Sequence, residues 1–392
     1  MNIAGIIAEF NPLHNGHKYL IQQAKKENDA VVAVMSGNFV QRGDTAIFSK
    51  FDRAKAAVQN GVDLCIELPT PWAMATAQTF AEGAVQIMNS LVFVNSLYFG
   101  SECADIDLIS RTSLIFSDKN FRDLITSQLK NGVTFAAARQ TAVSRIDERA
   151  ADILANPNDI LATEYISALN RSKSAIKPHC VKRQGVAHDS NEAAGQFLSA
   201  SQIRSLILAD EIDAIKPFCP ESAFEIIKNA NVSDIKRIET DILGKLRRSD
   251  VAAFRLLPDI SEGIENRLFS AAKSATSLDE LYSLIKTKRY TLSRIRRLVL
   301  SAYLDLKADY LKFPPPYARV LAFSKKGEEL IKIFNSITKI PLVMRAGDFE
   351  KLGNRENEIF AAERNATDLY ALSLKTPLPC GTEFTEKIYK EK

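Results

Sequence analysis

The sequence predicts an α/β protein: a Rossmann-like parallel sheet with a helical insertion, then a mainly helical C-terminal region that ends in a small α/β tail. Three observations support this prediction. Short apolar runs alternate with amphipathic helical patterns over the first hundred residues, a spacing typical of right-handed β-α-β units. The apolar spacing beyond them is helical. Three consecutive prolines at 314–316 then mark a break before a further strand-helix-strand pattern.

Each element follows from these patterns in chain order. Apolar runs predict strands at residues 3–8, 31–35, 63–68, 92–99 and 179–181. Helices are expected at residues 16–27, 51–60, 79–91 and 201–210, with a purely helical insertion at 104–175. In the tail we expect strands at residues 318–323 and 342–344 and a helix at 327–335.

A chain of 392 residues has the length of two or three domains. We predict an α/β domain at 1–210, a helical region at 211–310 and a small α/β region at 311–392.

Composition excludes several classes of protein. With 46% hydrophobic and 25% charged residues, the chain is globular rather than fibrous or disordered. No stretch of about 18 apolar residues lacks a charge, and the first residues do not form a secretion signal. We therefore expect a cytoplasmic protein with no membrane partner. The five cysteines are scattered without a C-x-x-C pair, which indicates buried thiols rather than disulfides or a zinc site.

Positive charge is concentrated in one stretch. Residues 241–300 carry 12 basic and 7 acidic side chains, a surplus of +5 against +4 for the whole chain. If the protein binds a polyanion, we expect it there.

The end of the first strand carries the strongest chemical signal. Pro12 ends the strand and a helix begins shortly after it. His14 and His17 are three residues apart, so on that helix they share one face near the N-terminus, where free N–H groups and the helix dipole favour an anion. Gly16 lacks a Cβ, which lets a flat ring or a phosphate approach the backbone. Ligands also bind at the carboxyl ends of parallel strands.

Two other interpretations compete with an anion site. The histidines can be chance neighbours on a helix surface, although the chain has only four. They can also bind a metal, but three-residue spacing without a third ligand nearby argues against this, and we predict no metal site.

At these residues the sequence resembles a known family. His14-Asn15-Gly16-His17 resembles the H-x-G-H signature of the nucleotidyltransferase superfamily, and residues 199–204 (SASQIR) resemble its S-S-T-x-I-R motif. Further blocks resemble the tRNA(Met) cytidine acetate ligase family: residues 36–43, 66–69, 99–102, 158–161, 182–183, 188–189, 263–268 and 287–290. The similarity runs through most of residues 1–345. Small departures are Phe10, Leu13 and Ser201-Gln202, where Tyr, Phe and Thr-Ala are expected.

The resemblance implies a fold of the nucleotidyltransferase type, an activity and a set of site residues. ATP, with Mg²⁺, would activate acetate as acetyl-adenylate, and the enzyme would acetylate N4 of the wobble cytidine of elongator tRNA(Met), releasing AMP and pyrophosphate. Residues 1–210 would form the ATP-binding catalytic domain, with His14 and His17 catalytic. The implied ATP contacts are Ile7, Ala8, Glu9, Phe10, Asn11, Pro12, Leu13, His14, Asn15, Gly16, His17, Leu20, Gly100, Asn158, Arg183, Ser201 and Arg204.

The second motif also has a physical rationale. Ser201 can donate to a phosphate at a helix start, and Arg204, one turn on, can reach the same anion. Alone, these residues fit a capped amphipathic helix equally well. Asn158 by itself favours an N-cap, and Gly100 and Arg183 have simple alternatives in a turn and a surface charge.

The roles of four other polar residues stay open. His188 with Asp189 is either an oriented base for the acceptor amine or, as we favour, a loop pair without chemistry. Arg42 and Lys50, near the end of the second strand, are further candidates for phosphate or tRNA contact.

The basic surplus predicts a patch that holds the tRNA backbone. Its cations, with no acid between them, are Lys286, Lys288, Arg289, Arg294, Arg296 and Arg297. Thr291 can cap a helix that turns Arg294, Arg296 and Arg297 to solvent and Leu292, Ile295 and Val299 inward, with Tyr290 available to stack. The simpler alternative is a solvated helix face.

Two alternative functions remain. One is an adenylyltransferase acting on a small phosphate-bearing cofactor precursor, which would leave the basic cluster unexplained. The other is a non-catalytic RNA-binding factor with a relic nucleotide site, in which His14→Ala or His17→Ala would leave RNA binding intact. The residues themselves do not distinguish acetate from its homologues, since one methyl group is worth only about 1–3 kcal/mol.

Overall fold

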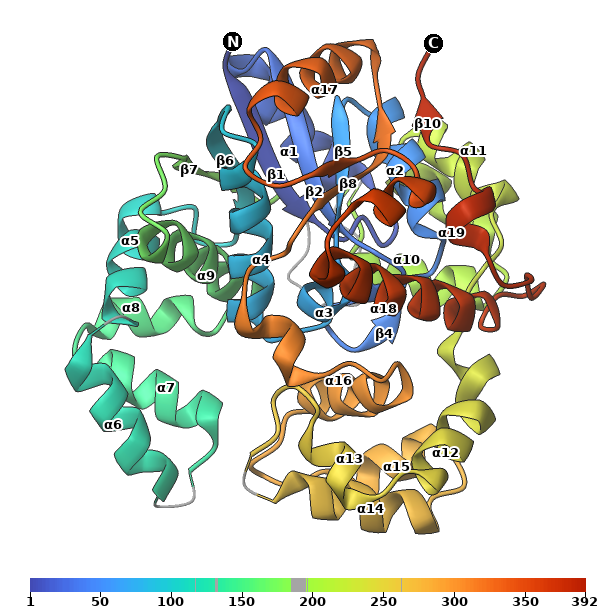
Figure 1. Ribbon diagram of the computed structural model, residues 1–392. Coiled ribbons are helices and arrows are strands. Elements are labelled where there is room, and N and C mark those ends of the chain that lie inside the picture. Colours follow the sequence, from blue (N-terminus) through green and yellow to red (C-terminus); the bar gives the residue numbers. More distant parts are fainter. Residues whose placement is uncertain (117, 131–132, 185–194, 196, 262) are drawn as a thin grey trace.

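The structure, a computed structural model, describes residues 1–116, 118–130, 133–184, 195, 197–261 and 263–392. Within these residues, eight strands form one mixed, mostly parallel sheet (Figure 1). Seven of them lie in the order β10 (Tyr389–Lys390), β8 (Ala318–Phe323), β5 (Leu64–Leu68), β2 (Ala30–Ser36), β1 (Ile3–Ala8), β6 (Val94–Ser101) and β7 (Lys177–Lys182). β9 (Leu342–Val343) pairs with β8. The predicted α/β fold is confirmed.

Helices cover both faces of this sheet. α1 (Asn15–Glu27) and α2 (Lys50–Gln59) pack on the face that includes Ala4 and Ile6 of β1. α4 (Ala77–Ser90) and α9 (Pro157–Arg171) pack on the face that includes Ile3 and Ile7. Burial on both sides explains why the central strands read as continuous apolar runs rather than as alternating ones.

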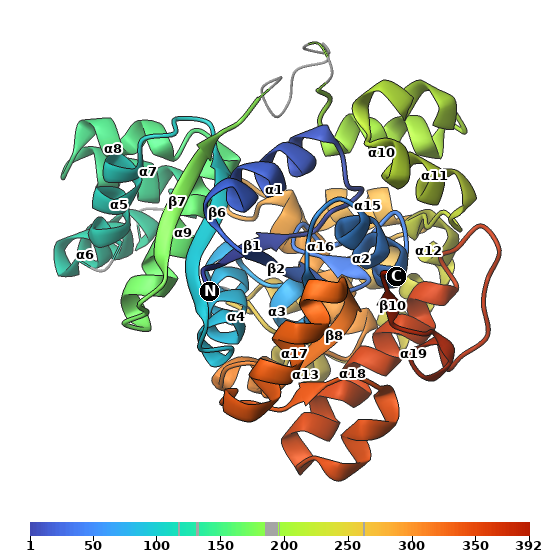
Figure 2. The ribbon, with the colours of Figure 1, turned by 90° about the horizontal axis from the view of Figure 1, so that it is seen from above.

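The insertion forms a helical group beside β6 and β7 (Figure 2). Its helices before α9 are α5 (Ile106–Ile115), α6 (Lys119–Lys130), α7 (Phe135–Ser144) and α8 (Glu148–Ile153). α5 packs on α9 and, more lightly, on β7.

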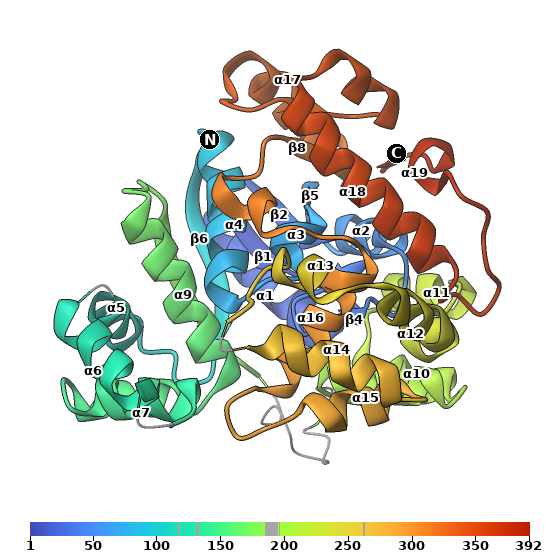
Figure 3. The ribbon, with the colours of Figure 1, turned by 60° about the horizontal axis from the view of Figure 1, so that its bottom comes forward.

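A second helical group lies below the sheet and packs around a second apolar core, to which Phe39, Met74 and Tyr370 from outside the group also contribute (Figure 3). It consists of η2 (Ile235–Ile238), α12 (Glu239–Arg248), α13 (Val251–Arg255), α14 (Ile264–Ser274), α15 (Leu278–Ile285) and α16 (Leu292–Tyr303). The chain reaches it through α10 (Ala200–Leu208), η1 (Ile212–Phe218) and α11 (Glu221–Asn229).

The C-terminal tail completes the main sheet. β8 pairs antiparallel with β5, with Leu64 opposite Phe323, so the tail shares the core of the first hundred residues. Its other elements are η3 (Ala308–Lys312), α17 (Lys325–Ile337), η4 (Ala346–Lys351), α18 (Asn354–Ala371) and α19 (Thr382–Thr385). The boundaries of the three predicted regions stay a prediction.

Some short features escape sequence periodicity. The hairpin of β3 (Phe39–Val40) and β4 (Asp44–Thr45) and the single turn α3 (Thr70–Ala73) are too short to show a repeat. The expectation of five buried thiols holds for Cys65 and Cys219, whereas Cys103 and Cys180 are half-buried and Cys380, on the loop before α19, is exposed.

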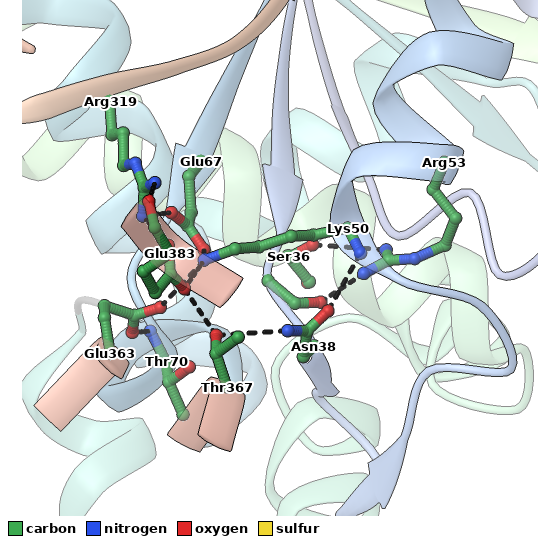
Figure 4. Close-up of polar contacts among 11 residues, drawn as sticks. Ser36, Asn38, Lys50, Arg53, Glu67, Thr70, Arg319, Glu363, Thr367 and Glu383 are labelled. Atoms are coloured by element: carbon green, nitrogen blue, oxygen red, sulfur yellow. Dashed lines mark hydrogen bonds and ion pairs between the residues drawn. The ribbon is translucent and has the colours of Figure 1, made fainter. Parts of the chain in front are cut away.

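A buried charge cluster joins the tail to the strand ends (Figure 4). Lys50 is fully buried, and its Nζ lies 2.5 Å from Glu67 Oε1, 2.6 Å from Glu383 Oε1 and 3.8 Å from Glu363 Oε2. Arg319 of β8 also pairs with Glu383 and Glu67. Lys50 is therefore not free to contact phosphate or tRNA, contrary to the expectation from its position in the sequence.

A second buried cation, Arg53 of α2, binds backbone carbonyls instead of carboxylates. Its Nη1 donates to Glu9 O at 2.6 Å and Ser36 O at 3.2 Å, its Nε donates to Phe48 O at 3.0 Å, and its Nη2 donates to Gly37 O. The ends of β1 and β2 are thus tied together next to the predicted ligand site.

Candidate functional site

A pocket of about 320 Å³ opens at the carboxyl ends of β1, β6 and β7, where the parallel sheet predicts a ligand. It brings together residues that are up to 197 positions apart, from Ile7 to Arg204. The predicted site residues that line it are Ile7, Ala8, Glu9, His14, Gly16, His17, Leu20, Gly100, Asn158, Arg183, Ser201 and Arg204.

Five other predicted contacts do not line this pocket: Phe10, Asn11, Pro12, Leu13 and Asn15. Phe10 and Leu13 are buried in the core beneath α1. Asn11, expected near the phosphates, accepts a hydrogen bond from Ile47 N at 2.8 Å through its side chain. Asn15 donates to Pro217 O at 2.9 Å. These residues shape the turn that presents the histidines.

His14 and His17 cap α1 for each other. Gly16 N donates to His14 Nδ1 at 3.0 Å, and His14 N donates to His17 Nδ1 at 3.3 Å. Their rings lie 3.9 Å apart, and the edge of Phe10 supports His17 at 5.2 Å. Because each Nδ1 accepts a hydrogen bond, each neutral ring carries its proton on Nε2.

The surroundings keep both rings neutral. Burial, followed by the charge of Arg183, lowers the pKa of His17 to about 3. Burial, followed by the nearby His17, Arg183 and Arg204, lowers the pKa of His14 well below its usual value. The pair therefore acts at neutral pH as two N–H donors rather than as two cations.

Gly16 is required by the histidine cap itself. A Cβ at this position would lie 2.9 Å from His14 Cε1 and 3.1 Å from His14 Nδ1. The sequence suggested that glycine admits a ligand close to the backbone; the structure adds that it first admits the His14 ring.

A second helix start contributes to the same pocket. Ser199 caps α10 and forms a capping box with Gln202, and Ser201 Oγ lies 3.1 Å from Ser199 Oγ. Arg204 donates to Asn11 O at 2.8 Å and so fixes the turn before α1. The motif therefore does both things expected of it: Ser199 caps the helix, and Ser201 and Arg204 line the pocket.

Arg183 and Asn158 are held by one carboxylate. Arg183 Nε lies 3.6 Å from Glu102 Oε1, and Asn158 Nδ2 donates to the same oxygen. Asn158 is not the cap of α9, because Asn156 occupies that position. The family-implied pocket role of Asn158 therefore fits its place better than the N-cap favoured by its local sequence.

Several pocket residues were not found from the sequence. They include Gln41, Ala77, Phe80, Phe99, Leu161, Tyr165 and Lys182. The apolar ones sit at ordinary core positions of strands and helices, so no local signal separates them from packing residues. Arg42, one of the open candidates, also lines the pocket. His188 and Asp189 lie outside the described residues.

The predicted basic patch is smaller than the sequence suggested. Arg297 is only 9% exposed and pairs with Asp259 at 3.3 Å, which corrects its placement toward solvent. Arg294 donates to Asp259 O at 2.8 Å and to Ser261 Oγ at 2.6 Å. The acid that was missing within the run comes from the loop before α14.

Two of its neighbours also differ from expectation. Tyr290 is 4% exposed and so is not available to stack on a base, and Leu292 is 41% exposed instead of facing inward. Lys286, Lys288 and Arg289 are exposed, and Arg296 is half-buried over the ring of Tyr282.

Two features are absent from the described part of the chain. None of its helices has the length and apolar character needed to cross a membrane. Its His, Cys, Asp and Glu side chains form no group of three or more that is placed to hold a metal ion.

A parallel sheet with an H-x-G-H helix start after its first strand, facing a second helix start with Ser201 and Arg204, defines a nucleotide site of the nucleotidyl transferase class. Residues 1–381 match the family model of the HIGH Nucleotidyl Transferase. Within that class, the chain belongs to the tRNA(Met) cytidine acetate ligase family, and the resemblance found in its motifs is confirmed.

Relatives and solved structures agree on this family. The tRNA(Met) cytidine acetate ligase of Thermoanaerobacter sp. (strain X514) is 36% identical over 100% of both chains. That of Clostridium tetani is 35% identical over 97% of both. The apo crystal structure of Thermotoga maritima TmcAL matches with a TM-score of 0.94, and its form bound with alpha-thio ATP with 0.92; both are 30% identical over 100% of both chains.

Proposed function

We propose that this chain is an ATP-dependent tRNA-modifying ligase of the cytoplasm. It activates acetate as acetyl-adenylate, releases pyrophosphate, and acetylates N4 of the wobble cytidine of elongator tRNA(Met) with release of AMP. The observation that carries this proposal is the pair of neutral, N–H-donating histidines at the start of α1, in a pocket shared with Arg183 and Arg204. Homologues named for this activity, and a neighbour bound with alpha-thio ATP, support it.

Activation needs a carboxylate oxygen to attack the α-phosphorus of ATP while pyrophosphate leaves in line. In our proposal the Nε2–H groups of His14 and His17 donate to the charge that develops on the phosphates. Such a preorganised donor is worth about 3 kcal/mol of barrier. Arg183, Ser201 and Arg204 hold the remaining phosphate charge. A neutral imidazole suits this role because it donates a hydrogen bond without adding a third positive charge that Arg183 and Arg204 would repel.

Mg²⁺ enters this proposal together with the triphosphate. Among the described residues that line the pocket, Glu9 carries a carboxylate, and the nearby Glu102 is already bound to Arg183 and Asn158. The ion would therefore be held mainly by the phosphate oxygens of ATP and its own waters, where it neutralises part of their charge.

The tRNA would approach over α16 and the hairpin of β3 and β4. Gly43 in this hairpin, at φ 75°, packs so closely on α16 that a Cβ would lie 2.5 Å from Arg297 N. This contact places Arg42, at the pocket, beside the helix that carries Arg296. The exposed Lys286, Lys288 and Arg289 extend the positive surface, which positions a phosphate backbone without reading its sequence.

The test is ATP conversion to AMP and pyrophosphate by the purified protein, with acetate and bulk tRNA each supplied or withheld, followed by mass analysis of the tRNA nucleosides. We expect AMP formation that requires acetate, and the mass gain of one acetyl group on cytidine. His14→Ala is expected to lose both and to keep its melting temperature within a few degrees. AMP without a modified nucleoside would favour an adenylyltransferase, and untouched ATP would refute the mechanism.

A further inference from the structure

The pocket has a second wall that phosphate chemistry does not use. His14, His17, Ser201 and Arg204 belong to α1 and α10. The second wall comes from the ends of β1 and β6, from the hairpin of β3 and β4, and from α4 and α9, the helices on the other face of the sheet. Its residues are Glu9, Gln41, Ala77, Phe80, Phe99, Leu161 and Tyr165. It is apolar and aromatic except for the Glu9 carboxylate and the Gln41 amide.

That carboxylate, Glu9, is held in place from two sides. Gln41 N donates to Glu9 Oε1 at 2.9 Å, and Arg53 donates to the Glu9 carbonyl at 2.6 Å. The next residue, Phe10, has a left-handed φ of 44° and is fully buried, so the chain turns sharply just after Glu9. No further hydrogen bond to the Glu9 side chain is found among the described residues, which leaves Oε2 available as an acceptor.

The charge of Glu9 makes it unsuited to the polyphosphate of ATP. A triphosphate carries about four negative charges at neutral pH, and a carboxylate next to it is repelled. An amino group is the natural partner of such an oxygen, and a glutamate accepting from the exocyclic amine of cytosine is a known form of base recognition. Glu9 therefore marks the part of the pocket that receives the acyl acceptor.

The aromatic residues beside Glu9 make this side of the pocket apolar. Phe80, Phe99 and Tyr165 are 2%, 3% and 4% exposed, so each presents only a small part of its ring to the pocket, and all three belong to one apolar cluster behind it. The Tyr165 hydroxyl has no hydrogen-bond partner among the described residues, and it lies within the electrostatic reach of Glu9. A nucleobase against this apolar side of the pocket would meet one charged acceptor, Glu9, and one unpaired hydroxyl donor, Tyr165.

We propose that Glu9 is the general base of the acyl-transfer step, an inference that rests on the proposed function. The N4 amino nitrogen of the cytidine attacks the carbonyl carbon of acetyl-adenylate. The new C–N bond forms, the C–O bond to the phosphate breaks, and AMP leaves with that oxygen. The proton lost from N4 passes to the Glu9 carboxylate and then to solvent. The Tyr165 hydroxyl orients the cytosine by donating a hydrogen bond to its ring.

The test separates the two half-reactions in the full-length protein. Glu9→Gln keeps an oxygen that can accept from Gln41 N but removes the base. Acetate-dependent exchange of pyrophosphate into ATP reports activation, and single-turnover formation of acetylated cytidine in tRNA reports transfer. We expect the rate of acetyl transfer to fall about 10²-fold or more, and the rate of pyrophosphate exchange to fall less than about tenfold. Tyr165→Phe should reduce transfer by a smaller factor.

Glu82→Gln is the matched control, because it makes the same change on α4 outside the pocket, where Glu82 pairs with Arg171. It should leave both half-reactions at the wild-type rate. If Glu9→Gln transfers acetyl at the wild-type rate, or loses both half-reactions equally, the role of Glu9 as base is refuted. If the wild-type protein itself forms no acetylated cytidine, the proposed function fails first, and the two failures are distinguishable.

Discussion

Removing the Lys50 amine from its buried cluster should lower the protein's free energy of unfolding by a large fraction. Lys50 lies within 2.6 Å of carboxylate oxygens on Glu67 and Glu383, and all three side chains are fully buried. Burial, followed by the charge of Glu67, raises the pKa of Glu363 to about 8, so this third carboxyl keeps its proton at pH 7. Two cations, Lys50 and Arg319, then balance two carboxylates.

Lys50→Met keeps the length of the side chain and deletes its charge. One buried carboxylate then has no counter-ion, because Arg319 alone faces both Glu67 and Glu383. Breaking a buried pair in this way costs about 3–5 kcal/mol. Against a total stability of about 5–15 kcal/mol, this is a large share. Urea denaturation, followed by far-UV circular dichroism, measures the loss.

A double variant tests the cause. Lys50→Met with Glu383→Gln removes a cation and an anion together, so its loss should be smaller than the sum of the two single losses by at least about 1 kcal/mol. Lys26→Met, on the exposed side of α1, serves as the control and should stay within about 0.5 kcal/mol of wild type. A Lys50→Met protein within about 1 kcal/mol of wild type would refute the charge balance described above.

Two further predictions concern the histidine pair. Because folding lowers the pKa of His17 from 6.5 to about 3, its contribution to stability is present above pH 6.5 and is lost as the pH falls toward 3. At pH 5 the loss is about 2 kcal/mol, and His17→Asn should remove that part of the pH dependence in urea titrations; an unchanged slope would contradict the buried neutral ring. Gly16→Ala should lower acetate-dependent pyrophosphate exchange at least about tenfold, because the new Cβ would lie 2.9 Å from His14 Cε1. Its melting temperature should hold, since alanine favours the helix by about 1 kcal/mol, and unchanged exchange would show that the His14 ring can move without loss.

Local patterns predicted much of the fold and the reactive end of the pocket. The β-α-β order follows from apolar runs and helical periodicity, which are properties of neighbouring residues. His14, Gly16 and His17 share one helix turn, so their proximity needs no knowledge of the rest of the chain. Ser201 and Arg204 are likewise one turn apart on α10, and the structure places both in the pocket.

The errors arose where distant segments meet. Arg297 was expected in solvent from the helical pattern of its own segment, but Asp259, on the loop before α14, pairs with it. Lys50 was an open candidate for phosphate contact, but Glu383, more than three hundred residues away, neutralises it. The sequence around Arg297 or Lys50 does not indicate Asp259 or Glu383 as a partner, because a single ion pair between distant residues produces no periodic pattern.

The sequence by itself determined which strand carries the chemistry and which residue types supply it, because helix starts, turns and strand ends are encoded within a few residues of each other. Only the tertiary structure decided the protonation of the histidines, since burial and the field of Arg183 set it. It also decided the second wall of the pocket. Glu9 follows the first strand, but its aromatic neighbours come from α4, β6 and α9, and only the folded sheet brings their ends to one edge.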